Sequence, residues 1–215
     1  MRNHKVYLFD FDGTLVDSMP YWSKKMLNIL KKSNTPYPDD IIKTIATLGD
    51  KGTAEYFKDV LKVGLSIDEM FTMMDEYALP KYRDEIILKD GVFEYISYLK
   101  ANGCSLNILT ASPHKMLDPC LKRNGIYDMF DNVWSTEDFG MVKVNPEIYK
   151  EAAKRLGREV GEVAFFDDNI GAVKTAMEAG MFTVAVYDES AAAFTDELKQ
   201  TADVYIESFK GFEMV

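Results

Sequence analysis

Short, almost wholly apolar runs recur along the chain, and stretches with helical periodicity lie between most of them. The longer runs suit parallel strands that are covered on both faces, and they occupy residues 6–9, 105–109, 163–166 and 183–186. Two shorter runs, at 133–134 and 204–206, extend the pattern. The helical stretches end at glycines, as expected of helix C-termini, namely Gly103, Gly125, Gly157 and Gly180. This alternation predicts an α/β fold built on a doubly wound parallel sheet.

The segment 17–87 breaks the alternation, because it contains amphipathic helical patterns and no convincing strand. One apolar face is formed by Trp22, Met26, Ile29 and Leu30, and another by Ile67, Met70, Phe71 and Met74. Turn-forming residues separate the patterns at 36–38, 49–52 and 64–66. A helical stretch of this length is too long for one crossover between strands. We therefore expect an all-helical cap domain at 17–87, inserted into a discontinuous core at 1–16 and 88–215.

The charge of the chain limits the partners that it can bind. Its 215 residues include 35 Asp and Glu against 25 Lys and Arg, which gives a formal net charge of −10. Residues 159–215 hold 12 of the acidic residues and 3 of the basic ones, so the excess is concentrated there. This balance argues against nucleic acid or an anionic membrane surface, because both would be repelled at long range. It is compatible with a small anionic substrate held by a metal ion.

The sequence has no pattern typical of export or membrane insertion. No run approaches the ~18 apolar residues that a membrane span needs. Asp10 and Asp12 come too early for the apolar segment of a secretory signal. Cys104 and Cys120 lie in an apolar run and a helix-like stretch, as expected of buried thiols in a reducing compartment. We therefore expect a soluble, cytoplasmic protein.

The strongest chemical feature is Asp10-Phe11-Asp12-Gly13-Thr14, directly after the first predicted strand. Alternate residues of an extended segment point the same way, so the two carboxylates can converge where the strand ends. The carboxyl ends of strands border the ligand crevice of an open α/β sheet, and Gly13 allows the chain to turn there. Two carboxylates at one place repel each other unless a cation lies between them, which favours a hard ion such as Mg²⁺. The alternative is a solvated acidic turn, which the position at a strand end disfavours.

Two weaker signals follow at comparable places. The second long strand ends in Thr110-Ala111-Ser112, where a hydroxyl and backbone N–H groups can hold phosphate oxygens. Lys143 stands just before a predicted helix that starts near Pro146. Taken alone, a threonine at a strand end is more often a cap, and a lone lysine is normally part of a solvated surface.

A second acidic pair, Asp167 and Asp168, follows the strand predicted at 163–166. Carboxylates next to such an apolar strand are costly to bury without a partner. All four signals therefore belong to one edge of the predicted sheet, because each follows a strand or precedes a helix there.

Together the four motifs resemble those of the haloacid dehalogenase superfamily, in particular its branch of small-metabolite phosphatases and phosphomutases with a helical cap. The first motif begins at Asp10, the second is Thr110, the third is Lys143, and the fourth is Asp167-Asp168. The resemblance covers nearly the whole chain. It implies a Rossmann-like core with strand order 3-2-1-4-5 and a requirement for Mg²⁺.

The resemblance also implies catalytic and metal-binding roles. Asp10 would be the nucleophile that attacks phosphorus and forms an aspartyl-phosphate. Asp12 would protonate the leaving oxygen and then activate water, with its backbone carbonyl on the metal ion. Asp168 would be a direct metal ligand together with Asp10, and Asp167 a second ligand or an outer-shell partner.

The phosphate-binding residues implied by the resemblance are Thr110, Ala111, Lys143 and Gly13. They would neutralise and hold the phosphoryl group as it moves between oxygen atoms. The third motif departs from the family pattern at Asn145, where relatives often have Lys-Pro-x-Pro. This departure leaves the geometry of the Lys143 loop open.

Asp12 separates the branches of the superfamily. The dehalogenases proper lack a carboxylate at this position, since they need no acid for the leaving group, and phosphonate-cleaving relatives replace it. The P-type ATPases share the nucleophile but need transmembrane helices. Asp12 therefore favours transfer of a phosphoryl group between oxygen atoms.

Two positions favour a phosphatase over a mutase that resembles β-phosphoglucomutase. Such mutases tend to have an aliphatic residue in place of Thr14 and an Arg-Gly pair in the first cap loop. Here that loop reads Gly49-Asp50-Lys51-Gly52. Lys51 is a candidate specificity residue of the cap that could reach the site when a lid closes, with a solvated lysine as the alternative.

These observations predict a Mg²⁺-dependent phosphatase for a small phosphorylated metabolite, of the sugar or polyol phosphate class, with no nucleic acid or membrane as partner. A hexose-phosphate mutase is the first alternative, because it forms the same aspartyl-phosphate. A non-catalytic phospho-ligand binding module is a remote alternative, which the presence of both Asp10 and Asp12 disfavours. We expect a monomer, because a cap of this type closes over its own core. The substrate itself stays open, since cap loops determine it.

Overall fold

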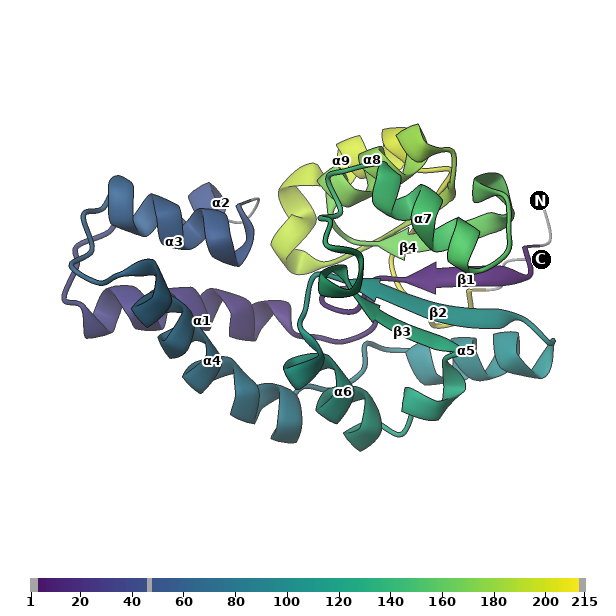
Figure 1. Cartoon of the computed structure of the whole chain (residues 1–215), viewed down its shortest axis with the longest axis horizontal. Helices are drawn as coiled ribbons and strands as arrows, with labels where there is room; N and C mark the ends of the chain where they lie inside the picture. Colours follow the sequence, from purple (N-terminus) through teal and green to yellow (C-terminus); the bar gives the residue numbers. More distant parts are fainter. Residues whose placement is uncertain (1–3, 46–47, 213–215) are drawn as a thin grey trace. The chain divides into compact units, whose positions relative to one another are not determined.

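The computed structural model describes residues 4–45 and 48–212, and the chain divides into two compact units. The first unit joins Met1–Asp17 to Ile86–Val215, and the second is Ser18–Glu85. Figure 1 shows the sheet of the first unit and the helices of the second. The chain therefore leaves the first unit after its first strand and returns to it before its second.

The first unit is built on a parallel sheet, which among the described residues has the strand order β3-β2-β1-β4-β5-β6. The strands are β1 (Val6–Phe9), β2 (Ser105–Thr110), β3 (Asn132–Ser135), β4 (Val163–Asp167), β5 (Phe182–Val186) and β6 (Val204–Ile206). The predicted order 3-2-1-4-5 is confirmed, and β6 adds an edge strand beside β5. Because β1 pairs with both β2 and β4, the residues that follow these three strands meet at one edge of the sheet.

Helices cover both faces of this sheet, as the predicted doubly wound fold requires (Figure 1). The helices α5 (Val92–Ala101) and α6 (His114–Arg123) lie on one face, and α7 (Glu147–Arg155) and α8 (Ile170–Ala179) lie on the other. A shorter helix, α9 (Thr195–Thr201), packs beside α8. Short 3₁₀ helices are η1 (Tyr127–Met129), η2 (Thr136–Phe139), η3 (Val160–Glu162) and η4 (Glu189–Phe194). Within the described parts of the chain, no helix combines the length and the apolar character needed to cross a membrane.

The strand β1 is apolar throughout because it is buried on both faces. Leu8 belongs to a core cluster with Ile148 of α7 and Ala176 of α8. Phe9 points to the opposite face, where its ring centroid lies 6.5 Å from that of Tyr95 in α5. Such two-sided packing explains why the run has no polar position. It also provides a rigid support for the residues that come next along the chain.

In its described residues the second unit contains helices and no strand, as expected of the insertion. Its helices are α1 (Met19–Lys32), α2 (Ile41–Ile45), α3 (Gly49–Asp59) and α4 (Ile67–Asp84). Their apolar faces share one buried core, which includes Met26, Ile29, Leu30, Phe57, Met70 and Met74. Ser66 begins α4 with a capping box, since its hydroxyl accepts from the backbone N–H of Glu69 and that glutamate bonds back to Ser66.

One local prediction in this unit is wrong, because residues 49–52 form the first turn of α3 and not a separating turn or loop. The carboxylate of Asp50 holds this turn in place. It accepts hydrogen bonds from the ammonium of Lys25, at 2.7 Å, and from the indole N–H of Trp22, at 3.0 Å. An acidic residue in the first turn also suits the positive end of the helix dipole.

Candidate active site

Three buried carboxylates gather at the carboxyl ends of β1 and β4. Each of Asp10, Asp167 and Asp168 offers an oxygen atom, and these atoms lie within 4.8 Å of one another. Asp10 and Asp168 are 6% exposed, and Asp167 is fully buried. Asp10 is held at the sheet by its backbone N–H, which donates to the carbonyl of Phe166 at 2.8 Å. Hard, oxygen-seeking cations such as Mg²⁺ and Ca²⁺ take ligand sets of this kind.

Lys143 supplies positive charge to this carboxylate group. Its ammonium lies 2.5 Å from Oδ1 of Asp10 and 2.6 Å from Oδ2 of Asp167, with 12% of the side chain exposed. The loop that carries it is fixed by the Tyr149 hydroxyl, which donates to the Lys143 carbonyl at 3.0 Å. The side-chain oxygen of Asn145, where the sequence departs from the family pattern, accepts from the backbone N–H of Glu147 at 3.1 Å, just before α7.

The pKa values of two carboxyl groups in this cluster are raised although a lysine lies among them. Burial raises the pKa of Asp10 to about 7, with Lys143 opposing the rise and Asp167 adding to it. The pKa of Asp168 is also raised. Burial is the main cause, and the negative charges of Asp167 and Asp10 add to it. For Lys143, burial lowers the pKa, but Asp10 and Asp167 outweigh it and the net pKa is raised. The lysine therefore stays charged, and its charge favours the ionised form of Asp10.

The turn after β1 brings its backbone against the same carboxylates. Gly13 adopts φ +73°, and a Cβ atom there would meet the carboxylate of Asp168. The hydroxyl of Thr14 donates to Oδ1 of Asp168 at 2.9 Å. The backbone N–H of Gly13 donates to the carbonyl of Val16 at 3.0 Å, which closes the turn. Glycine is required here both for its left-handed conformation and for the close approach.

Asp12 is not a member of the group of three carboxylates. Its carboxylate instead accepts a hydrogen bond from the hydroxyl of Ser112, in the loop after β2. Asp12 forms a β-bridge with Val16 just beyond the end of β1. Whether the Asp10 and Asp12 side chains share one ion stays a prediction. The Asp12 side chain is thus held by Ser112, outside the group formed by Asp10, Asp167 and Asp168.

Thr110 ends β2 and is 1% exposed. Its hydroxyl oxygen accepts from the backbone N–H of Ser112 at 3.1 Å, which folds the loop back toward β1. Ala111 lies exposed between them. Ser112 is a site residue that sequence reasoning did not single out, although its place in the second motif was a signal for it.

Lys51, the candidate specificity residue, belongs to the second unit. It lies in the first turn of α3 with 81% of its side chain exposed, 4.0 Å from Glu55. Its role stays a prediction.

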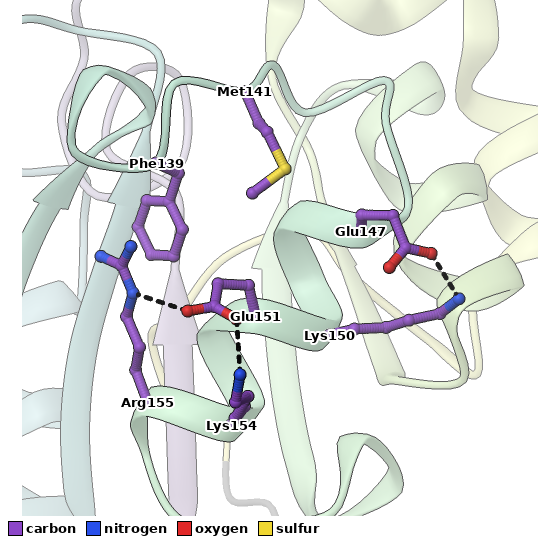
Figure 2. Close-up of a pocket in the computed structure, with 7 residues that line it drawn as sticks. All are labelled: Phe139, Met141, Glu147, Lys150, Glu151, Lys154 and Arg155. Carbon is purple, nitrogen blue, oxygen red and sulfur yellow. Dashed lines mark hydrogen bonds and ion pairs between the residues drawn. The ribbon is translucent and has the colours of Figure 1, made fainter.

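A separate hollow lies between the loop at 139–141 and α7 (Figure 2). Its lining residues are Phe139, Met141, Glu147, Lys150, Glu151, Lys154 and Arg155. The charged side chains pair with one another, as in the ion pairs of Lys150 with Glu147 and of Arg155 with Glu151. None of these residues belongs to the carboxylate group, so this hollow is not the candidate site.

Comparison with known proteins agrees with this fold. The haloacid dehalogenase-like hydrolase family matches residues 4–180, and the chain belongs to that family. The validoxylamine A 7'-phosphate phosphatase of Streptomyces hygroscopicus subsp. limoneus is 26% identical over 199 residues, which cover 91% of this chain and 92% of that protein. The phosphorylated carbohydrates phosphatase of Thermotoga maritima is 22% identical over 174 residues, covering 81% of each chain. The predicted superfamily and the prediction of a hydrolase are confirmed.

The fold has been seen in solved structures. CbbY of Rhodobacter sphaeroides, solved in complex with xylulose-(1,5)bisphosphate, matches with a TM-score of 0.82 at 19% sequence identity. The match covers 96% of this chain and 95% of that one. At this identity the likeness establishes a shared fold.

Proposed function

We propose that the protein is a Mg²⁺-dependent phosphatase that hydrolyses a sugar or polyol phosphate through an aspartyl-phosphate on Asp10. The observation that carries the proposal is the buried group of Asp10, Asp167 and Asp168 with the ammonium of Lys143 at 2.5 Å from Asp10. Asp10 and Asp168 hold Mg²⁺ with their carboxylates, Asp12 with its backbone carbonyl, and Asp167 as a further or outer-shell ligand. The ion supplies charge neutralisation for the phosphoryl oxygens.

In the first half-reaction, Asp10 attacks phosphorus in line and a bond forms between its carboxylate oxygen and phosphorus. The bond from phosphorus to the ester oxygen breaks, and Asp12 donates a proton to that leaving oxygen. Lys143 and Thr110, with the backbone N–H groups around Gly13 and Ala111, hold the phosphoryl oxygens during transfer. The product of this step is the free alcohol.

In the second half-reaction, Asp12 accepts a proton from a water molecule as the water attacks phosphorus. The bond between phosphorus and Asp10 breaks, which releases phosphate and restores both carboxyl groups to their starting states. Ser112 holds the Asp12 carboxylate for both proton transfers, since its hydroxyl donates to that carboxylate.

The substrate class is supported by the relatives, whose names specify a phosphorylated carbohydrate and validoxylamine A 7'-phosphate. A panel of sugar and polyol phosphates, assayed for released phosphate with Mg²⁺ and with EDTA, tests the proposal. We expect turnover with Mg²⁺, none with EDTA, and none for Asp10→Asn with Mg²⁺. Asp196→Asn, on the surface helix α9, is the matched control and should keep full activity. Full activity in Asp10→Asn contradicts the mechanism.

The mutase alternative gives a different product from the same site. β-Glucose 1-phosphate would then be converted to glucose 6-phosphate without release of phosphate. We expect released phosphate in place of the isomer, and a product analysis of this one reaction decides between the two.

We propose further that the enzyme is a cytoplasmic monomer. Its two cysteines, Cys104 and Cys120, are buried and unpaired, which suits a reducing compartment. Light scattering of the eluted protein tests the oligomeric state, and a molecular mass of one chain is expected.

A further inference from the structure

A partly buried lysine, Lys89, lies next to the turn that follows β1. The ammonium of Lys89 donates to the carbonyl oxygens of Gly13, at 2.6 Å, and Tyr187, at 2.5 Å, and lies 3.0 Å from Oδ2 of Asp188. Its side chain is 19% exposed, and that of Asp188 is 6% exposed. All three N–H donors of the ammonium are thus matched with acceptors. This arrangement joins the turn after β1 to the loop after β5.

The backbone of Lys89 is anchored to the same turn. Its N–H donates to the carbonyl of Leu15 at 3.0 Å, and a bridge joins Leu88 to Val16. The segment that returns from the second unit therefore runs beside the end of the segment that leaves for it. Lys89 reaches Gly13 from a fixed backbone position, and a flexible surface lysine would not be held in this way.

The position of Gly13 matters for the carboxylate group. A Cβ atom at Gly13 would lie 2.6 Å from Asp168, and Thr14, the next residue, donates to Asp168 at 2.9 Å. The carbonyl that Lys89 holds belongs to the peptide between Gly13 and Thr14. A shift of that peptide would thus disturb the contacts of Gly13 and Thr14 with Asp168. It would also move the backbone of Asp12, which precedes Gly13 in the chain.

We propose that Lys89 is a positioning residue for phosphoryl transfer, which acts by clamping the Gly13–Thr14 peptide against the loop after β5. This inference rests on the phosphatase activity proposed above. Lys89 does not touch the reacting atoms. It holds the turn that places Asp12 and the Thr14–Asp168 hydrogen bond, so its loss should slow chemistry more than it weakens substrate binding.

The test compares Lys89→Met with Lys100→Met. Lys100, in α5, pairs with Asp131 at 2.6 Å beside the start of β2, so its loss removes an ion pair of the same unit away from the turn. For Lys89→Met we expect kcat per folded molecule to fall by about tenfold or more with KM changed by less than about threefold. For Lys100→Met we expect both constants to stay near their original values. An unchanged kcat in Lys89→Met, or an equal loss in Lys100→Met, overturns the proposal.

Lys89→Gln keeps the measurement decisive if Lys89→Met does not fold. The glutamine amide retains N–H donors but has no charge, so we expect a kcat between those of the original protein and Lys89→Met. In Lys89→Gln, as in Lys89→Met, kcat equal to that of the original protein contradicts the clamp.

Hydrogen exchange gives a readout that needs no substrate. In both Lys89 variants the amides of residues 11–16 should exchange about tenfold faster or more, while those of β2 keep their rates. If the original protein releases no phosphate from any ester, the proposed function fails, and the exchange rates alone decide whether Lys89 holds the turn. Unchanged exchange at 11–16 rules the clamp out.

Discussion

A Cβ atom at Gly13 would lie 2.6 Å from Oδ2 of Asp168, a distance that real Cβ contacts do not reach. Gly13→Ala must therefore displace either the turn or the carboxylate. The variant also pays for its left-handed φ of +73°, which costs about 1–2 kcal/mol for a residue with a Cβ. Only glycine therefore fits at position 13, where the backbone of the first motif packs against Asp168 of the fourth.

We predict that Gly13→Ala lowers kcat by about a hundredfold, because a displacement of about 1 Å in a catalytic group has an effect of this size. Gly103→Ala is the matched control, since Gly103 has a φ of +71° with nothing within 4 Å of its Cβ position. Both variants should lose similar stability from their φ angles, but only Gly13→Ala should lose activity. Steady-state kinetics with thermal unfolding of both variants checks this, and equal activity in the two would contradict the steric account.

The raised pKa of Asp10 predicts a pH dependence of stability in the metal-free protein. Burial raises this pKa from 3.8 to about 7, so the folded state binds more protons than the unfolded state between these values. The free energy of unfolding should therefore decrease through this group as the pH rises from about 4 to about 7. Replacement by asparagine removes the titration.

Thermal unfolding in EDTA at a series of pH values measures this effect. The stability of Asp10→Asn relative to the original protein should rise as the pH increases, and Mg²⁺ should reduce the difference, because the cation favours the ionised carboxyl. If the free energies of unfolding of the two proteins change in parallel between about pH 4 and pH 7, burial does not raise the pKa of Asp10.

The hydrogen bond from Ser112 to Asp12 predicts an effect that depends on the leaving group. Ser112→Ala removes the donor that holds the acid, so esters whose alcohol needs a proton should lose about tenfold in kcat. p-Nitrophenyl phosphate has a leaving group that departs without a proton. With this ester, formation of the aspartyl-phosphate by Ser112→Ala should slow much less. Ser208→Ala, whose hydroxyl donates to the carbonyl of Asp90, is the control.

Rapid-quench measurements of the first half-reaction with both esters separate these cases. An equal loss with both leaving groups would mean that Ser112 supports the loop and has no part in proton transfer.

The sheet and the carboxylate group were predictable from sequence for the same physical reason. Continuous apolar runs indicate buried parallel strands, and the ends of such strands meet at one edge, so Asp10 and Asp167 could be expected together. Lys143 follows no strand directly, and its expected place rested on the family resemblance. In the structure its ammonium lies 2.5 Å from Asp10 and 2.6 Å from Asp167.

Side-chain pairs that are remote in sequence could not be predicted. Lys89 is 76 residues from Gly13, and Ser112 is 100 residues from Asp12, so no local pattern encodes either hydrogen bond. The turn expected at 49–52 failed for a similar reason, because the partner that holds Asp50 in a helix is the distant Lys25. Local propensity was overridden there by a tertiary ion pair.

The most direct test of the central claim is to trap the phosphorylated enzyme. The protein is mixed with Mg²⁺ and an ester that it hydrolyses, quenched in acid within one turnover, digested and examined by mass spectrometry. The account predicts one added phosphoryl group on the peptide that contains Asp10, and none on Asp10→Asn. Release of phosphate by an enzyme that carries no phosphoryl group, or carries it on another residue, would contradict it.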